Sequence, residues 1–212
     1  MNHVTNLAVA ATLCFSLVSP SALANLISNG DFEADAAGWT LSGNLHVVGP
    51  SGPPFWYGGG TAAQNGTRVA TFNAFDTIPN GFYSQTVPTT AGETYRLQFF
   101  YGVTDVTSAN PDSQSILVEA IGSGTLLSQM VNGTNPPIGL AQFDYLFDAD
   151  SATTTIFFRD LTSNDTISQD GILDNVSLNS VSVPEPASLM LLGLGLAGLG
   201  FSRRKNSKAL GQ

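Results

Sequence analysis

Short runs rich in β-branched and aromatic residues recur along most of this chain, and several of them alternate apolar and polar positions. The clearest runs lie at 95–101, 115–121, 141–147 and 153–158. A period of two is typical of strands with one buried face, and Gly- and Pro-rich turn signals separate the runs. No helical period competes before residue 187. The pattern therefore predicts an all-β fold, an antiparallel β-sandwich with jelly-roll topology.

The first 24 residues differ from this pattern. An apolar stretch at 7–18 is broken by a Pro-Ser pair, and an Ala-Leu-Ala triplet ends at Ala24. This arrangement is typical of a signal peptide, so we expect residues 1–24 to be removed on export and Asn25 to become the N-terminus. The segment before residue 7 has no Lys or Arg, which departs from the usual pattern, and an uncleaved N-terminal anchor is the alternative.

The C-terminal stretch has three parts. Pro184, Glu185 and Pro186 come first, an uncharged apolar run with four glycines occupies 187–201, and Arg203, Arg204 and Lys205 follow. As a helix the run would be about 22 Å long, short of the roughly 30 Å hydrocarbon core, so it would cross a bilayer only with thinning or help from flanking residues. A buried core helix is the alternative, but glycine weakens such a helix by up to about 1 kcal/mol per residue. Basic residues beside a membrane segment stay on the cytoplasmic side, which predicts an external body.

This order of motifs resembles the PEP-CTERM sorting signal of Gram-negative bacteria that make extracellular polysaccharide. The resemblance implies that the chain is exported and held at the membrane in transit. It further implies processing by exosortase near the Pro-Glu-Pro motif and a final place at the cell surface or in the extracellular matrix. The expected organisation is a signal peptide at 1–24, a sandwich at 25–182, a sorting segment at 183–205 and a tail at 206–212.

Charge and cysteine content narrow the classes of partner. The body carries three arginines against fifteen Asp and Glu, a net charge of −12, and the whole chain has −9. Nucleic acids and anionic lipid surfaces need basic patches, so we expect neither as a partner of the body. The only cysteine, Cys14, lies in the predicted signal peptide, so the mature protein would hold no disulfide.

A series of short motifs spans the predicted body. Asn-Leu-Ile-Ser-Asn-Gly-Asp-Phe-Glu at 25–33 and Gly-Trp at 38–39 stand near its start, 83–87 and 91–101 in its middle, and Gly-Ile-Leu-Asp-Asn-Val-Ser-Leu at 171–178 near its end. Their order resembles the galactose-binding-domain-like jelly rolls, a superfamily that includes carbohydrate-binding modules attached to xylanases and glucanases. The resemblance covers 25–178, nearly the whole body.

The same resemblance implies a structural calcium site between the first and last strands. Carried over by position, its ligands are the side chains of Glu33 and Asp174 and the carbonyl of Asp31. Carboxylates and carbonyls are the oxygen ligands that calcium prefers. The alternative is that Asp31 and Asn29 shape the turn around Gly30 and that Asp174 and Asn175 only end a strand.

Sugar binding needs an exposed aromatic face and a few polar groups. Trp56 and Tyr57 lie in a Gly- and Pro-rich loop at 49–60 and are candidates for stacking on a sugar ring. Gln85, Asn73 or Asp76 would supply hydrogen bonds. The alternative is that the loop folds back and its aromatic residues complete the core, and Trp39 is expected in the core in either case.

Catalytic motifs are scarce in the predicted body. It has one histidine, His46, which is expected on a strand surface, no cysteine, and no nucleophile-elbow, zinc-protease or phosphate-loop motif. We therefore expect a non-catalytic module that binds or organises polysaccharide. Two alternatives stay open: a structural or adhesive matrix protein with protein partners, and an enzyme acting on glycosides through paired carboxylates.

Overall fold

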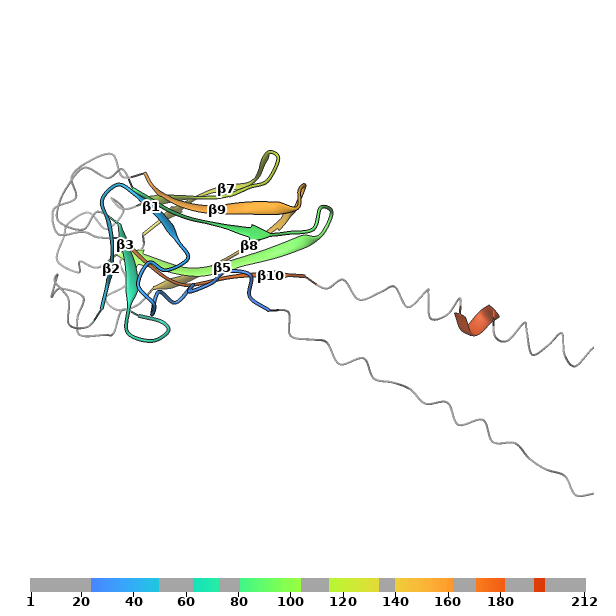
Figure 1. Ribbon diagram of the computed structural model, residues 1–212, viewed down its shortest axis with the longest axis horizontal. Helices are drawn as coiled ribbons and strands as arrows, with labels where there is room; N and C mark the ends of the chain where they lie inside the picture. Colours follow the sequence, from blue (N-terminus) through green and yellow to red (C-terminus); the bar gives the residue numbers. More distant parts are fainter. Residues whose placement is uncertain are drawn as a thin grey trace, which may run out of the picture.

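Ten strands make up the body in the computed structural model, which describes residues 24–49, 63–72, 81–103, 115–133, 140–161, 171–181 and 193–196 (Figure 1). The strands are β1 (Thr40–Ser42), β2 (Leu45–Val48), β3 (Val69–Phe72), β4 (Phe82–Pro88), β5 (Thr94–Val103), β6 (Ser115–Ile121), β7 (Thr125–Asn132), β8 (Ala141–Asp148), β9 (Thr153–Asp160) and β10 (Gly171–Ser180). Each of the four runs expected from the sequence is a strand.

The strands form two five-stranded sheets that stack face to face (Figure 1). Sheet A has the order β1-β4-β9-β6-β7, sheet B has the order β2-β3-β10-β5-β8, and every pair is antiparallel. The chain crosses between the sheets several times, for example from β4 in sheet A to β5 in sheet B. The predicted antiparallel β-sandwich is confirmed.

Alternation along the strands builds the core between the sheets. In β5, Tyr95, Leu97, Phe99 and Tyr101 are at most 3% exposed and face sheet A. Phe99 meets Phe158 of β9 edge to face, with ring centroids 5.1 Å apart. Such aromatic pairs add about 0.5–1.5 kcal/mol to the free energy of burial. Trp39 is also buried, as expected, and its indole N–H donates to the carbonyl of Asn29 at 3.0 Å.

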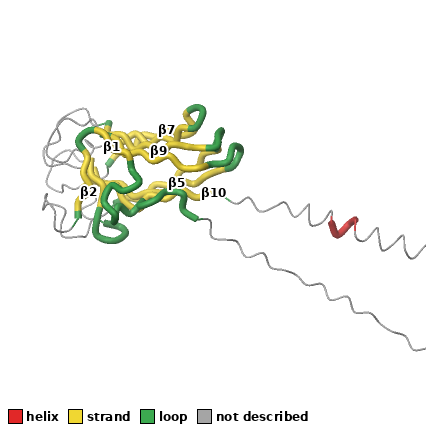
Figure 2. Tube along the Cα trace, viewed as in Figure 1, coloured by secondary structure: helices red, strands yellow, loops and turns green. Residues whose placement is uncertain are grey.

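The two ends of the body lie side by side. The N–H of Leu26 donates to the carbonyl of Leu178 at 2.8 Å, and the side chain of Asn25 accepts from the N–H of Leu178. Figure 2 shows the first described residues running beside the end of β10. The carbonyl of Gly30 accepts from Val176, and a Cβ on Gly30 would collide with the Val176 carbonyl. The N-terminal motif is therefore fixed against the last strand, at and beyond the register shift between Asp174 and Ser177.

The C-terminal apolar run is described only at 193–196, which is helical. In the part of the chain that the structure describes, no helix is both long enough and apolar enough to cross a membrane. The predicted signal peptide up to residue 23 lies outside the described residues, as do the sorting residues Pro184, Glu185, Pro186, Arg203 and Arg204.

Candidate functional site

The three acidic residues expected to hold calcium come from opposite ends of the body and meet one segment. Asp31 and Glu33 lie in the loop before β1, and Asp174 lies in β10. Each accepts a hydrogen bond from the segment 64–68, which precedes β3. The structure thus places these three residues around a segment to which the sequence analysis gave no role.

Glu33 holds this segment through its backbone. The Oε1 atom accepts the N–H groups of Thr67 at 2.7 Å and Arg68 at 2.6 Å. These bonds, that from Thr67 foremost, hold the pKa of the Glu33 carboxyl below its ordinary value. Gly66 has a φ of +72°, and a Cβ there would collide with the Glu33 carboxylate. Only glycine meets both conditions at this turn.

Asp174 holds the same segment from the sheet and has no exposed surface. Its Oδ2 accepts the N–H groups of Gln64 at 2.6 Å and Asn65 at 3.1 Å, and its Oδ1 accepts that of Asn175 at 2.7 Å. Burial raises the pKa of Asp174 to about 6, with a further increase from the charge of Asp31, against the lowering effect of the three N–H groups. Because the pKa is raised in the folded state, the stability gained by protonation is lost as the pH rises through about 6.

These contacts bear on how a metal would be held. Among the described residues, no three Asp, Glu, His or Cys side chains are grouped closely enough to hold a metal ion. The carboxylates of Glu33 and Asp174 already accept backbone N–H groups. A calcium ion at this place would therefore need carbonyl ligands in addition to these carboxylates. Calcium stays a prediction. The alternative was wrong in one respect, because Asp174 does not end its strand: β10 continues to Ser180 past a register shift between Asp174 and Ser177.

Gln85 was expected to contact a ligand, but it is buried and bonded to Ser28. Its side chain points from β4 toward the N-terminal loop and the residue is 7% exposed. The Oε1 atom accepts from the N–H and the hydroxyl of Ser28, and Nε2 donates to the Ser28 carbonyl at 3.0 Å. The physical reason is register, since Gln85 shares the inward face of β4 with Tyr83 and Val87. Trp56 and Tyr57, like Asn73 and Asp76, lie outside the described residues.

The outer face of sheet A carries a group that sequence reasoning missed. Phe82 of β4 and Phe157 of β9 pack edge to face with ring centroids 5.7 Å apart. The Arg159 guanidinium carbon lies over both rings, 5.3 Å from the centroid of Phe82 and 4.6 Å from that of Phe157. The Arg159 Nε donates to Glu119 Oε2 of β6 at 2.9 Å. Three neighbouring strands therefore hold one cation above two rings. We call Phe82, Glu119, Phe157 and Arg159 the aromatic face.

Apolar and hydroxyl groups extend the aromatic face along sheet A. Leu117 lies opposite Arg159, and Met130, which is 65% exposed, lies opposite Leu117 on β7. The hydroxyls of Thr86 and Thr155 bond to each other at 2.9 Å. The sequence held one signal for this face, because adjacent residues on a strand point to opposite sides and either Phe157 or Phe158 had to face outward.

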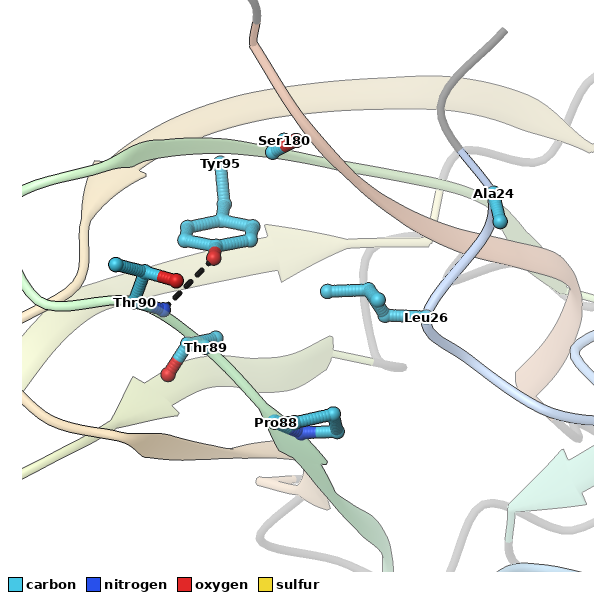
Figure 3. Close-up of a pocket in the computed structure, with 7 residues that line it drawn as sticks. All are labelled: Ala24, Leu26, Pro88, Thr89, Thr90, Tyr95 and Ser180. Atoms are coloured by element: carbon cyan, nitrogen blue, oxygen red, sulfur yellow. Dashed lines mark hydrogen bonds between the residues drawn. The ribbon is translucent and has the colours of Figure 1, made fainter.

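A separate pocket of about 300 Å³ lies where the two ends of the body meet (Figure 3). It is lined by Ala24, Leu26, Pro88, Thr89, Thr90, Tyr95 and Ser180. The Tyr95 hydroxyl accepts the N–H of Thr90 at 2.9 Å and donates to the Glu93 carboxylate at 3.3 Å, so its polar group is already bonded internally. The aromatic face is therefore the stronger candidate for binding.

Comparison with known proteins bears on both parts of the chain. Residues 182–205 match the PEP-CTERM protein-sorting motif. The chain carries this sorting signal. The signal implies export and a C-terminal membrane anchor for sorting. No curated protein sequence matches the chain.

Solved structures are similar to the body. The carbohydrate-binding module TmCBM61, in complex with β-1,4-galactotriose, is 18% identical over 74% of this chain and 99% of that chain, with a TM-score of 0.55. A family 16 carbohydrate-binding module is 18% identical over 73% and 99%, with a TM-score of 0.51. A Stig cyclase, Fisc, from Fischerella sp. TAU is 17% identical over 76% and 99%, with a TM-score of 0.57. At these identities the likeness shows the fold alone, a jelly-roll sandwich that two carbohydrate-binding modules and a cyclase share.

Proposed function

We propose that this exported protein binds polysaccharide through the aromatic face, without catalysing a reaction. The observation that supports the proposal most is the stack of Arg159 over Phe82 and Phe157 on the outside of a five-stranded sheet. The C–H side of a sugar ring packs on aromatic and aliphatic groups, and its hydroxyls accept hydrogen bonds from groups such as a guanidinium. The carbohydrate-binding modules among the similar structures support the same class of ligand.

Charge favours a neutral polysaccharide. Each arginine of the body is paired with a carboxylate: Arg68 with Asp35 at 3.5 Å, Arg96 with Asp144 at 3.4 Å, and Arg159 with Glu119 at 2.9 Å. The body's net charge of −12 repels polyanions. A neutral chain of hexoses or pentoses meets neither obstacle, so we propose galactans, xylans and glucans as the class to which the ligand belongs.

Affinity electrophoresis of the full chain on gels containing galactan, xylan or mixed-linkage glucan tests this proposal. We expect retardation by at least one of these polymers. Phe157→Ala should weaken binding about tenfold, since truncating a key aromatic residue of a binding surface costs more than about 1 kcal/mol. Phe100→Ala is the matched control, because Phe100 lies on sheet B, on the face away from the core, and is also half-buried. Equal weakening by both variants would contradict the proposed face.

Two further measurements distinguish the proposed function from its alternatives. If Trp56→Ala abolishes binding and Phe157→Ala does not, the ligand is held by the loop at 49–60 and the aromatic face is not the site. If incubation with the polymer releases new reducing ends, the protein acts on glycosides and the non-catalytic part of the proposal is wrong. Binding to none of the polymers would favour the matrix protein with protein partners.

A further inference from the structure

Met130 is the most exposed large apolar residue of the described strands, at 65%. A single exposed apolar side chain is ordinary on a protein surface and needs no explanation by itself. Met130 is not isolated, however, because it belongs to the same sheet as the rings of Phe82 and Phe157. The strand register fixes where it lies relative to these rings.

Four outward side chains form one row across sheet A. Phe82 of β4 is paired with Arg159 of β9. Arg159 is in turn paired with Leu117 of β6, and Leu117 with Met130 of β7. Directly paired residues of antiparallel strands point to the same face of a sheet, and Val131, next to Met130, belongs to the core. Met130 therefore points outward with the other three, and we call these four side chains the cross-strand row.

The spacing of the cross-strand row matches a linear sugar chain. Neighbouring strands lie about 4.8 Å apart, so the three intervals from β4 to β7 cover about 14 Å. Residues on one face of a single strand are about 6.7 Å apart, because side chains alternate between the two faces. One pyranose unit of a linear polysaccharide is closer in length to the first repeat than to the second. A chain that crosses the strands therefore presents one sugar unit to each of the four.

Polar groups lie beside the cross-strand row. In the next register, Phe157 is paired with Glu119, and Glu119 is paired with Ser128, which is exposed. The Ser128 hydroxyl can donate or accept a hydrogen bond, and the Glu119 carboxylate, which keeps 16% of its side-chain surface, can accept one from a sugar hydroxyl. A mostly apolar row beside a polar one suits a sugar ring, which has an apolar C–H side and a rim of hydroxyls.

We propose that Leu117 and Met130 extend the polysaccharide-binding site, so that the bound chain crosses β4, β9, β6 and β7 and Met130 contacts the fourth sugar unit. This inference rests on the proposed function, since it concerns the same site. Methionine is unbranched and its polarisable sulfur adapts to irregular partners, which suits contact with one end of a bound oligosaccharide. Met130 therefore sets the length of sugar chain that the protein binds most tightly.

Calorimetric titration of the full chain in detergent, with linear β-1,4-linked oligomers of galactose, xylose and glucose, tests the inference. We expect the affinity to rise with each unit up to four and to change little in longer oligomers. In the series that binds, Met130→Ala should weaken binding of the tetrasaccharide about fivefold, since it removes an apolar contact, and should leave binding of the disaccharide unchanged. Leu146→Ala is the matched control, because Leu146 is 53% exposed on β8 of sheet B, and it should alter neither.

Oxidation of Met130 provides a second measurement, on the native chain. The chain has three methionines, and Met130 is the one within the predicted body. Dilute hydrogen peroxide converts methionine to its sulfoxide, which mass spectrometry of the peptides detects. The tetrasaccharide at saturating concentration should slow the oxidation of Met130 several-fold. It should leave that of Met190 unchanged, because Met190 lies in the sorting segment.

The outcomes distinguish this inference from the proposed function. If Phe157→Ala weakens binding but Met130→Ala has no effect at any length, the aromatic face binds sugar without reaching β7, and the inference alone is overturned. Equal weakening of the disaccharide and the tetrasaccharide by Met130→Ala would overturn it as well. If no oligomer binds and no polymer retards the chain, the proposed function and the inference both fail.

Discussion

The two outer faces of the sandwich are built differently although both belong to five-stranded antiparallel sheets. On sheet B, Ile172 is 2% exposed, Asp174 has no exposed surface, and the segment 64–68 is bonded to the Asp174 carboxylate. On sheet A, Phe82 and Phe157 stay partly exposed, Arg159 keeps 38% of its side-chain surface, and Glu119 keeps 16%. The part of sheet B around β3 and β10, which we call the closed face, is covered by a loop that a buried carboxylate fixes. The part around β5 and β8 stays exposed, as Arg96 and Asp144 show. If the proposed function holds, the closed face contributes to stability and the aromatic face of sheet A contributes to binding.

The largest effect is expected on the closed face. Asp174→Ala removes the acceptor of three N–H groups and leaves them without their partner, at a cost of about 1–3 kcal/mol for each group that stays buried. Removing a buried charge offsets part of this cost, so we expect a net loss of about 3 kcal/mol, or roughly 6–12 °C in melting temperature. Thermal unfolding followed by circular dichroism measures it.

Asp144→Ala is the matched control for that measurement. Asp144 also lies on the outer face of sheet B, but its side chain is 44% exposed and pairs with Arg96 at the surface. Exposed ion pairs contribute about 0–1 kcal/mol, so the melting temperature should barely change. Comparable losses from the two variants would mean that the loop at 64–68 does not depend on Asp174.

Calcium binding provides a second test of how the acidic residues around Asp174 stabilise the closed face. If the acidic residues bind calcium with the help of carbonyl groups, adding the ion at 100 times its dissociation constant stabilises the folded state by about 2.7 kcal/mol. We expect a rise in melting temperature in calcium that a chelator reverses and that Asp174→Asn abolishes. An unchanged melting temperature in calcium and in chelator would leave Asp174 with its hydrogen-bonding role alone.

The sequence was informative about strands because their signals are local. Alternation at 115–121 and 153–158 depends only on which residues face the core, and both runs are strands in the structure. The pairing of first and last motifs followed from a family resemblance. Neither source could place 64–68 against Asp174, because that contact joins residues about 110 positions apart in the chain.

The sites were harder to predict for a related reason. Gln85 was chosen for its polar side chain, but its strand register turns that side chain inward to Ser28. Arg159, Phe82 and Glu119 come from three strands that are neighbours only once the sheet order is known. Composition singled out the loop with Trp56 and Tyr57, whereas the aromatic face needs the order β4-β9-β6 to exist at all.

The smallest effect on stability, and the sharpest test of the comparison, is expected from two arginine variants. Arg159→Met removes the cation over Phe82 and Phe157 and its bond to Glu119. Arg96→Met removes a similar surface ion pair from the outer face of sheet B. Because both side chains are more than a third exposed, each change should alter the free energy of unfolding by at most about 1 kcal/mol.

Polysaccharide binding should distinguish the two arginine variants, although their stabilities are similar. Affinity electrophoresis on the polymer that retards the native chain should show binding weakened about tenfold by Arg159→Met and unchanged by Arg96→Met, since only Arg159 offers donors beside an aromatic surface. If the two variants bind alike, the aromatic face of sheet A has no greater role in binding than the exposed part of sheet B. The guanidinium stack would then act only to cover two phenylalanine rings that the strand alternation turns outward.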